Sequence, residues 1–466
     1  MNLCELLDRA AGRWPQKPAF IEGDAAVSYA EIVERVNSLA AQLKTLHLPP
    51  GCRVGLSFQN SVQYVALTFA LWRVNAVVVP IPTECAAEEV ATIAAMTQLE
   101  AIVSERSLHE GASPMAGFFF RRLTPAQAPD NHGLNIAFIR FTSGTTNARK
   151  GVVLCHESVR DRVFAANKAL RIGPADTVAW CLPMSHHFLI TIVLYLAEGA
   201  TILLARHVLA RPFLEAVNRW KATVLYAAPF HYALLARDES GTAISSVRLA
   251  VSTTCALPEG IADDFLKRFN LPLMQALGVI ELGLVSLNAD DPARRWDSVG
   301  RPLADHQLQI LAPDEDGNGD VVIRGPGFFD AYVAPWMTRE QVLRDGWFHT
   351  GDIGRLDADG FLYLAGRKTA VINLAGRKVF PEEIEAVLNR HPDVRESRVY
   401  GRSHPQLGEV VEAELVLNRP DADAEKVREF CRASLGSHKM PANFRVVDSL
   451  LRTAATGKLR RTVAVA

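Results

Sequence analysis

The chain has almost no net charge and no long apolar run. Its 50 basic and 51 acidic side chains leave a formal net charge of −1. That balance gives no reason to expect a surface for nucleic acid or for an anionic membrane. No apolar stretch reaches the roughly 18 residues that a membrane-spanning helix needs. We therefore expect a soluble protein without a membrane span.

Cysteine is scarce as well. The seven cysteines are scattered, odd in number and form no CxxC pair. This favours free thiols in a reducing compartment over disulfides or a metal site. The N-terminus carries Glu5 and Asp8, where a signal peptide would be basic and then apolar. These features predict a cytoplasmic protein, and a length of 466 residues predicts two or more domains.

Short apolar runs alternate with longer amphipathic segments up to about residue 255. The runs are continuous in Val, Ile and Leu, as in parallel strands that are covered on both faces. Residues 28–46 instead place Ile32, Val36 and Leu39 at helical intervals. The alternation predicts an α/β body of layered helices and sheets. The expected strands are residues 53–58, 76–82, 200–205, 222–229 and 247–252.

The pattern changes after about residue 345. The sequence DADG at 357–360, between apolar runs, predicts a hairpin. Pro381 and the two acids after it predict the start of a helix. Residues 409–417 alternate in the manner of a half-exposed strand. We expect a small α+β domain of about a hundred residues at the C-terminus, joined near residues 366–369.

A cluster of hydroxyl side chains follows the strand expected at residues 136–141. The sequence TSGTT at 142–146 places four hydroxyls around Gly144, and Lys150 follows. Hydroxyls and backbone N–H groups in a turn suit phosphate oxygens, and glycine permits backbone angles that a side chain forbids. The segment is not a GxxxxGK[ST] loop, because Gly151 and not Ser or Thr follows the lysine. A Ser/Thr-rich surface turn is the alternative interpretation.

Four stretches, in order, resemble the ANL superfamily of adenylate-forming enzymes, which contains acyl- and aryl-CoA synthetases, adenylation domains and luciferases. FTSGTTNARKG at 141–151 is similar to the phosphate signature, and 346–367 resembles the ribose-binding segment. Residues 373–385 resemble the start of the mobile domain, and 452–461 the catalytic lysine motif. The chain is closest in character to short stand-alone ligases. The resemblance implies a large multi-sheet α/β N-terminal domain at 1–366, which binds ATP and the carboxylate, and a small mobile α+β lid domain at 367–466.

The resemblance also implies the chemistry and the residues that perform it. A carboxylate attacks the α-phosphate of ATP to give an acyl-adenylate and pyrophosphate, and a thiol then displaces AMP. Lys458 would bridge the carboxylate and the α-phosphate, Glu281 would bind Mg²⁺, and Asp352 would accept hydrogen bonds from both ribose hydroxyls. The other implied residues are Thr142, Ser143, Gly144, Thr145, Thr146 and Lys150 at the phosphates, Leu277, Gly278, Ile280 and Arg367 at the nucleotide, Gly376 at the thiol tunnel, and Thr369 at the hinge.

Two histidines precede an apolar run at 186–193. His186 best matches the family position that lines the acyl pocket near the carboxylate, and it is implied as a catalytic residue. His187 and Phe230 are further candidates for that pocket. A buried, hydrogen-bonded structural histidine is the alternative for either histidine. The pocket segments are apolar and aromatic, which favours an aryl or medium-length aliphatic acid over an amino acid.

Several signature positions differ from those of the family. Asn147 and Arg149 stand where glycine and proline are usual. Leu277 replaces the aromatic ring that stacks on adenine, and Ile280 replaces the threonine that contacts the α-phosphate. The loss of one ring stack and one charge-assisted hydrogen bond would cost about 2–4 kcal/mol of nucleotide affinity if nothing compensates. A degenerate, non-catalytic relative that binds a nucleotide or a carrier protein is therefore the alternative to a working ligase.

The leading hypothesis is an ATP-dependent carboxylic acid–thiol ligase with ATP and Mg²⁺ as cofactors. Its acceptor is CoA or a carrier protein, and both present the same phosphopantetheine thiol. Short stand-alone members of the family often serve secondary metabolism, where carrier proteins are common. A luciferase-like oxygenase is a third interpretation, although nothing in the sequence points to a luminophore.

Overall fold

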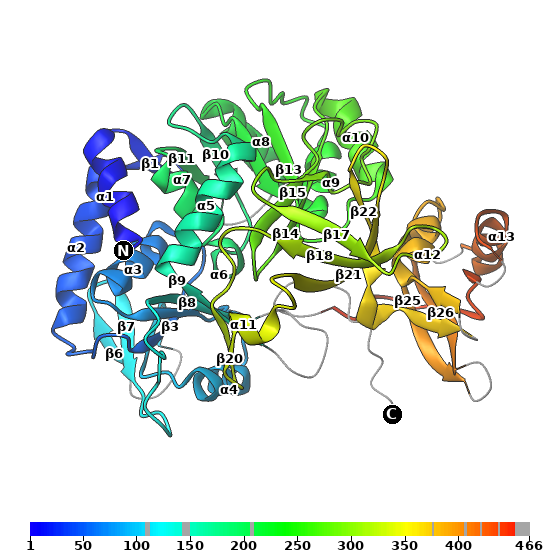
Figure 1. Ribbon diagram of the computed structural model, residues 1–466. Coiled ribbons are helices and arrows are strands. Elements are labelled where there is room, and N and C mark those ends of the chain that lie inside the picture. Colours follow the sequence, from blue (N-terminus) through cyan, green and yellow to red (C-terminus); the bar gives the residue numbers. More distant parts are fainter. Residues whose placement is uncertain are drawn as a thin grey trace. The chain divides into compact units, whose positions relative to one another are not determined.

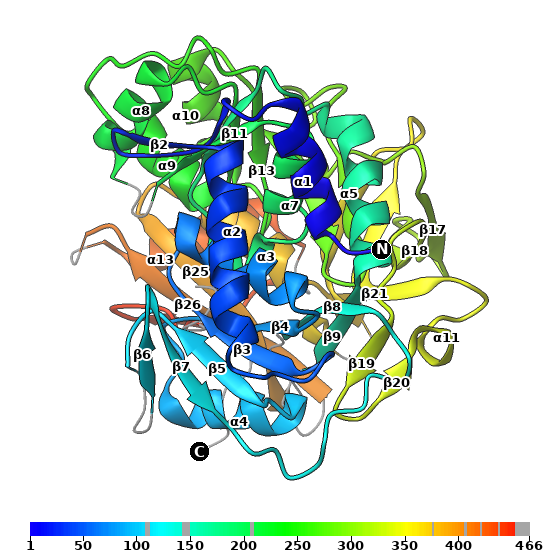
Figure 2. The same cartoon turned by 90° about the vertical axis from the view of Figure 1, so that its left-hand side faces the viewer.

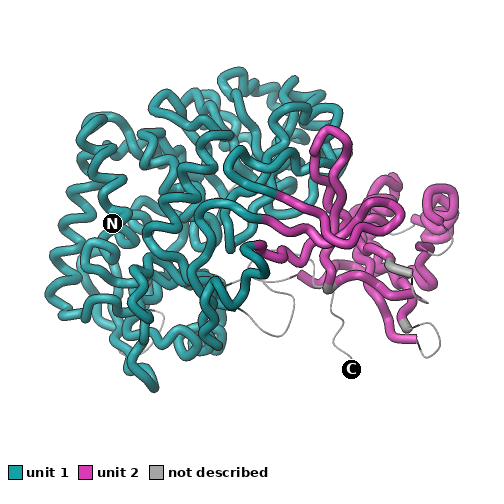
Figure 3. Tube along the Cα trace, viewed as in Figure 1, with its two compact units in different colours: residues 1–142, 150–307, 324–346 teal, residues 143–149, 308–323, 347–466 magenta. Residues whose placement is uncertain are grey.

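The computed structural model describes residues 1–107, 112–141, 150–205, 209–374, 377–404, 408–419, 422–436 and 439–452. The chain divides into two compact units (Figure 3). Unit 1 comprises Met1–Thr142, Lys150–Gln307 and Arg324–Gly346, and unit 2 comprises Ser143–Arg149, Leu308–Ile323 and Trp347–Ala466. The domain boundary expected between residues 366 and 367 stays a prediction.

The first sheet of unit 1 has nine strands, and its central strands are parallel. Three segments expected to be buried strands form β11, β12 and β13, which confirms those predictions. The strand order is β16 (Arg301–Pro302), β15 (Gly283–Leu287), β14 (Met274–Val279), β13 (Leu249–Ser252), β12 (Val224–Ala227), β10 (Thr177–Trp180), β11 (Thr201–Leu204), β1 (Pro18–Glu22) and β2 (Ala25–Ser28).

The second sheet of unit 1 also has nine strands. It carries the remaining two expected strands of the α/β body, β3 and β4, and the strand expected at 136–141, β8. Its order is β20 (Met337–Thr338), β19 (Ala331–Val333), β9 (Gly151–Cys155), β8 (Ile136–Phe141), β4 (Val77–Pro80), β3 (Arg53–Ser57), β5 (Ala101–Ser104), β7 (Phe118–Arg122) and β6 (Ser113–Met115).

Helices cover both sheets in layers (Figures 1 and 2). One group lies between the sheets: α1 (Cys4–Arg13), α2 (Tyr29–Lys44), α3 (Val62–Arg73), α5 (His156–Leu170) and α7 (Ile192–Ala197). Within it, α5 contacts β15 of the first sheet and β9 of the second. The outer face of the first sheet packs against α8 (Ala210–Arg219), α9 (Pro229–Ala236) and α10 (Glu259–Phe269), and that of the second against α4 (Ala87–Thr97). The short helices of unit 1 are α6 (Met184–His187) and α11 (Arg339–Val342).

The helix predicted over residues 28–46 is α2, and its start follows from local chemistry. The hydroxyl of Ser28 accepts a hydrogen bond from the backbone N–H of Glu31, and the Glu31 carboxylate accepts one from the backbone N–H of Ser28. This reciprocal pair satisfies two of the N–H groups that a helix start leaves without partners. Ile32 and Val36 are buried, so the apolar periodicity does mark the face that packs inward.

Unit 2 contains two smaller sheets. One runs in the order β17 (Gln307–Leu311), β18 (Gly319–Arg324), β21 (Phe348–Leu356) and β22 (Leu362–Arg367). The other runs β24 (Arg377–Val379), β23 (Ile372–Leu374), β26 (Gly408–Leu417) and β25 (Val394–His404), with β27 (Asn443–Val446) paired to β26. Its helices are η1 (Lys368–Ala370), α12 (Pro381–Leu388) and α13 (Ala424–Ser434).

Two predictions for the C-terminal region are confirmed, and one is corrected. The hairpin expected at 357–360 joins β21 to β22, and the helix that begins at Pro381 is α12. The strand at 409–417 was expected to be half-exposed, but Glu414 on its polar face is 3% exposed. Arg398 and Arg445 approach the Glu414 carboxylate at 2.6 and 2.9 Å. A carboxylate can be buried when cations pair with it, and alternation alone does not reveal such partners.

The mixed α/β architecture with several sheets confirms the predicted fold class. In the part of the chain that the structure describes, no helix is long and apolar enough to cross a membrane. The seven cysteines all lie within the described residues, and no disulfide joins any two of them.

Candidate active site

Strands β8 and β9 flank the TSGTT segment. They are antiparallel neighbours, and Phe141 pairs with Gly151 at the end of their ladder. A Cβ atom at Gly151 would collide with the side chain of Val333, so the close approach of β19 requires a glycine at this position. The predicted phosphate residues Thr142, Ser143, Gly144, Thr145 and Thr146 themselves lie outside the described residues, as do Gly376 and Lys458.

Glu281, Tyr332 and Lys150 form a cluster in unit 1. Glu281 lies in the turn after β14 and is 9% exposed, and its Oε1 accepts a 2.8 Å hydrogen bond from the Tyr332 hydroxyl. Burial, assisted by the charge of Glu281, raises the pKa of Tyr332, so the phenol keeps its proton and remains a donor. The Nζ of Lys150 lies 4.9 Å from the centroid of the Tyr332 ring. A carboxylate, a phenol and an ammonium group therefore meet beside the strands that flank TSGTT.

Arg162 of α5 holds the segment that carries Ile280 and Glu281. Its side chain is 2% exposed and donates to the backbone carbonyls of Ile280 at 2.9 Å and Glu281 at 3.2 Å. It also donates to the carbonyl of Gly327. Because these carbonyls occupy its donors, the buried guanidinium acts as a clamp on the backbone. Burial lowers the pKa of Arg162 to about 10, which still leaves it charged near neutral pH.

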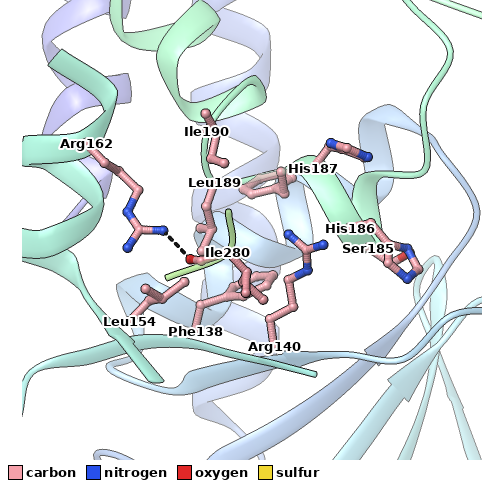
Figure 4. A pocket seen from close by; sticks show the side chains of 11 residues that line it. Phe138, Arg140, Leu154, Arg162, Ser185, His186, His187, Leu189, Ile190 and Ile280 are labelled. Atoms are coloured by element: carbon pink, nitrogen blue, oxygen red, sulfur yellow. Dashed lines mark hydrogen bonds between the residues drawn. The ribbon is translucent and has the colours of Figure 1, made fainter. Parts of the chain in front are cut away.

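A narrow pocket opens beside this cluster (Figure 4). The Nδ1 of His186 lies 2.9 Å from the hydroxyl of Ser185, and the ring of His187 packs edge-on against Trp180 with centroids 6.1 Å apart. The free space is about 10 Å³, room for about one water molecule. The pocket therefore admits a water-sized group and nothing larger in this conformation. It is lined by Phe138, Arg140, Leu154, Arg162, Ser185, His186, His187, Phe188, Leu189, Ile190 and Ile280.

The remaining predicted residues of unit 1 lie on β14 and α9. Leu277 is half-buried and Gly278 is exposed, at a break in the register between β14 and β15. Ile280 follows the strand and lines the narrow pocket. Phe230 is 66% exposed, so its side chain is not part of the packed core. The roles of these residues stay predictions.

In unit 2, Asp352 and Arg367 pair across the β21–β22 hairpin. The Nε of Arg367 lies 2.8 Å from Oδ1 of Asp352, and the guanidinium also donates to the carbonyl of Thr350 at 3.1 Å. The side chain of Asp352 is 7% exposed and that of Arg367 is 55% exposed. The carboxylate is thus held in place by a cation that remains open to solvent. Thr369, the expected hinge, lies in η1.

The cluster of Glu281, Tyr332 and Lys150 offers one buried carboxylate, which fits Mg²⁺ better than a metal ion that protein side chains enclose completely. Among the described residues, no group of three or more His, Cys, Asp or Glu side chains could enclose an ion. Magnesium is usually bound by one or two carboxylates together with phosphate oxygens and waters. Glu281, a buried carboxylate fixed by the Tyr332 hydroxyl, suits that mode of binding.

Three residues of this region were missed by the sequence analysis: Arg140, Arg162 and Tyr332. Arg140 had a visible signal, since it interrupts the apolar run IAFIRF of β8. Tyr332 and Arg162 had no such signal. Their roles depend on β19 and α5 lying beside the turn that carries Ile280 and Glu281. That turn is more than 50 residues from Tyr332 and more than 100 residues from Arg162 along the chain.

Comparison with known proteins places the chain in a family. A family model described as AMP-binding enzyme matches residues 7–333, and one described as AMP-binding enzyme C-terminal domain matches residues 383–458. A sulfoacetate–CoA ligase of Cupriavidus necator is 28% identical, over 99% of this chain and 96% of the relative. A 2-succinylbenzoate–CoA ligase of Bacillus licheniformis is 27% identical, over 97% of this chain and 98% of the relative.

Solved structures show the same fold. The o-succinylbenzoate CoA synthetase of Bacillus subtilis, in complex with its acyl-adenylate intermediate, superimposes with a TM-score of 0.86. The two sequences are 24% identical, and the match covers 98% of this chain and 96% of that one. Since the family matches span both the N-terminal body and the C-terminal region, the chain belongs to the AMP-binding enzyme family.

Proposed function

We propose that this protein is an ATP-dependent carboxylic acid–thiol ligase that forms an acyl-adenylate and then an acyl-thioester. The observation that carries this proposal is the cluster of Glu281, Tyr332 and Lys150 beside the strands that flank TSGTT. It combines a hard oxygen ligand with a cation, which is what a site for a metal-bound polyphosphate needs. The relatives that span the whole chain are acid–CoA ligases, which supports the same reaction.

In the first step, a carboxylate oxygen of the acid bonds to the α-phosphorus of ATP. The bond from that phosphorus to the oxygen bridging to the β-phosphorus breaks, and pyrophosphate leaves with the bridging oxygen and its electrons. No proton is transferred. Mg²⁺ supplies charge neutralisation for the phosphates when it is bound at Glu281. Two anions must approach each other in this step, so oriented cations and donors lower its barrier.

The residues of this chain divide the remaining tasks. Lys150 and the hydroxyls of residues 142–146 hold the phosphates, and Lys458 bridges the carboxylate and the α-phosphate. Asp352 accepts hydrogen bonds from the ribose, and Arg367 fixes its carboxylate. His186, oriented by Ser185, lies at the carboxylate end of the acyl pocket. In the second step the thiolate attacks the acyl carbon, passing Gly376, and AMP leaves.

The acid and the acceptor are the finer parts of the proposal. The segment predicted to face the acyl pocket, residues 186–193, is largely apolar, which favours an acid with an aryl or aliphatic body. CoA is the acceptor of the relatives described above. A carrier protein would present the same phosphopantetheine thiol, and we keep it as the second candidate acceptor.

Exchange of labelled pyrophosphate into ATP tests the first step without any acceptor. The panel consists of benzoate, hexanoate, sulfoacetate and 2-succinylbenzoate, with no acid as the blank. Acid-dependent exchange is expected for at least one member, followed by thioester formation when CoA or a phosphopantetheinylated carrier protein is added. The Lys458→Ala variant is the matched control, because it should bind ATP but not exchange. The proposal is contradicted if the protein is folded but shows no pyrophosphate exchange with any of the four acids.

Leu277 and Ile280 favour one alternative, a relative that binds nucleotide or a carrier protein without turnover. Both side chains are aliphatic and offer no hydrogen-bond donor to a nucleotide. Under this alternative, calorimetry would detect AMP or ATP binding while exchange remained at the blank level. Both assays on the same preparation therefore separate the two functions.

A further inference from the structure

Arg140 is a charged residue inside an apolar strand. It occupies the fifth position of β8, IAFIRF, whose first four residues are buried. Its Nε is buried and has no hydrogen-bond partner among the described residues, whereas the residue as a whole is half-buried. A buried polar atom without a partner costs free energy, so its presence needs a reason. Burial lowers the pKa of Arg140 to about 10, with Glu281 opposing the shift, so the group is a cation near neutral pH.

The strand register aims Arg140 at the candidate active site. Arg140 pairs with Val152 of β9, and Val152 pairs with Tyr332 of β19. Paired residues project from the same face of a sheet, so the Arg140 side chain lies on the face that carries the phenol bound to Glu281. Figure 4 shows its guanidinium directed into the narrow pocket, near Ile280 and the segment with Ser185 and His186.

The pocket has two arginines, and they differ in how many N–H donors they can offer a ligand. Arg162 donates to three backbone carbonyls and is committed to holding the chain. No hydrogen bond from Arg140 to another described residue is present. Ile280, across the pocket, contributes no donor. Arg140 is therefore the cation in this pocket that can bind a small anionic group, and its planar fork matches the geometry of a carboxylate or a phosphate.

We propose that the Arg140 guanidinium contacts the reacting carboxylate of the acid and the oxygens of the α-phosphate while the acyl-adenylate forms. This inference rests on the proposed function. In that step negative charge gathers where the carboxylate oxygen meets the α-phosphorus, before pyrophosphate departs. A guanidinium that spans the two groups balances this charge and takes the place of the donor that Ile280 cannot supply.

Two other roles for Arg140 give different results in the same experiment. The guanidinium could serve only as a counter-charge that stabilises Glu281, in which case its loss would weaken folding and the fit of the site without selective loss of chemistry. It could also bind a second, remote acidic group of the substrate, in which case only acids with two acidic groups would depend on it.

The test compares Arg140→Gln, Arg140→Lys and the double variant Arg140→Gln with Ile280→Thr. Arg35→Gln, on the exposed face of α2, is the matched control for loss of one arginine. Pyrophosphate exchange is measured for benzoate, hexanoate, sulfoacetate and 2-succinylbenzoate, with kcat and KM determined separately. Melting temperature and AMP affinity by calorimetry report on the fold and on the nucleotide site, independently of the chemistry.

We expect Arg140→Gln to lower kcat about 100-fold for every acid that the parent chain uses, as for removal of one oxyanion donor. Arg140→Lys keeps the charge without the fork, and we expect about a 10-fold loss. In the double variant a hydroxyl at position 280 should restore about 10-fold of the activity, an effect that a structural role would not produce. AMP carries the α-phosphate, so its affinity should also fall in Arg140→Gln, but by a smaller factor than kcat, because the contact strengthens as charge gathers in the reaction.

Each opposing result has one meaning. If the parent chain is active and the Arg140→Gln variant has the same kcat, this inference is overturned and the proposed function still stands. Loss confined to sulfoacetate and 2-succinylbenzoate also overturns it, in favour of a remote anion. A lowered melting temperature without recovery in the double variant marks Arg140 as a structural counter-charge and overturns it too. If Arg140→Gln does not fold, an Arg140→Lys variant with unchanged kcat is the overturning result. A parent chain without exchange overturns the proposed function itself.

Discussion

The Asp352→Ala substitution separates a nucleotide ligand from a structural carboxylate. The side chain of Asp352 is 7% exposed and pairs with Arg367 across the hairpin at 2.8 Å. The Arg367 side chain is 55% exposed, so solvent screens the pair, and the pair contributes about 0–1 kcal/mol to stability. When Asp352 is removed, Arg367 can turn into water. We therefore expect the free energy of unfolding to fall by about 1 kcal/mol or less.

Nucleotide affinity should respond much more strongly. A hydrogen bond to a charged acceptor contributes about 1.5–3 kcal/mol, and a ribose offers two hydroxyls to the carboxylate. Taking the lower value for each bond, the loss is about 3 kcal/mol, which raises the Kd of AMP about 150-fold. Isothermal titration calorimetry with AMP measures this change directly, and urea unfolding measures stability on the same preparation.

Arg367→Gln is the matched control, because it breaks the same ion pair but keeps the carboxylate. Its Kd for AMP should rise by tenfold at most, much less than that of Asp352→Ala. The reasoning is refuted by a folded Asp352→Ala variant whose Kd for AMP stays within about threefold of the parent. That result would make Asp352 a residue of the hairpin and not of the nucleotide site.

Three further predictions concern other parts of the chain. Lys458→Ala should lower acid-dependent pyrophosphate exchange by at least about 100-fold while the Kd of ATP by calorimetry changes less than threefold; retained exchange would contradict its assignment. Tyr332→Phe removes the 2.8 Å hydrogen bond to Glu281 and should lower the free energy of unfolding in urea by about 1.5 kcal/mol, whereas an unchanged value would mean that the bond contributes nothing. His156 is buried and accepts from the backbone N–H of Leu3, and burial lowers its pKa to about 4. Between about pH 6.5 and pH 4 the unfolded chain therefore binds a proton at this histidine that the folded chain does not bind. The free energy of unfolding should keep its full value above pH 6.5 and fall by up to about 3 kcal/mol as the pH drops through that window. A His156→Gln variant with the same acid dependence of unfolding would contradict this.

Local chemistry explains why much of the architecture could be predicted. Continuous Val, Ile and Leu runs marked β3, β4, β11, β12 and β13, because strands buried on both faces cannot carry polar side chains. The helical spacing of Ile32, Val36 and Leu39 marked α2, and the sequence DADG marked the turn between β21 and β22. In each case the determining contacts lie within a few residues of each other along the chain. The family resemblance depended in the same way on short motifs that can be read in order.

The buried polar network could not be predicted from the sequence. Residues 409–417 were expected to form a half-exposed strand, but within it Glu414 is buried between Arg398 of β25 and Arg445 of β27. Arg162 has the sequence context of an ordinary helix arginine, yet it holds carbonyls more than 100 residues away. A charged side chain can be buried only where distant elements supply partners, and one residue's sequence context does not contain those partners.

By itself, the sequence determined the layered α/β body, the order of the motifs and the residue types that a phosphate and ribose site requires. Those features depend on periodicity and on contacts between near neighbours. Only the tertiary structure decided that Arg140, Ile280 and His186 line one pocket, and that Tyr332 fixes the Glu281 carboxylate. Strands β8 and β19, the turn after β14 and helix α6 must pack together before these side chains meet, so their chemistry is a property of the fold.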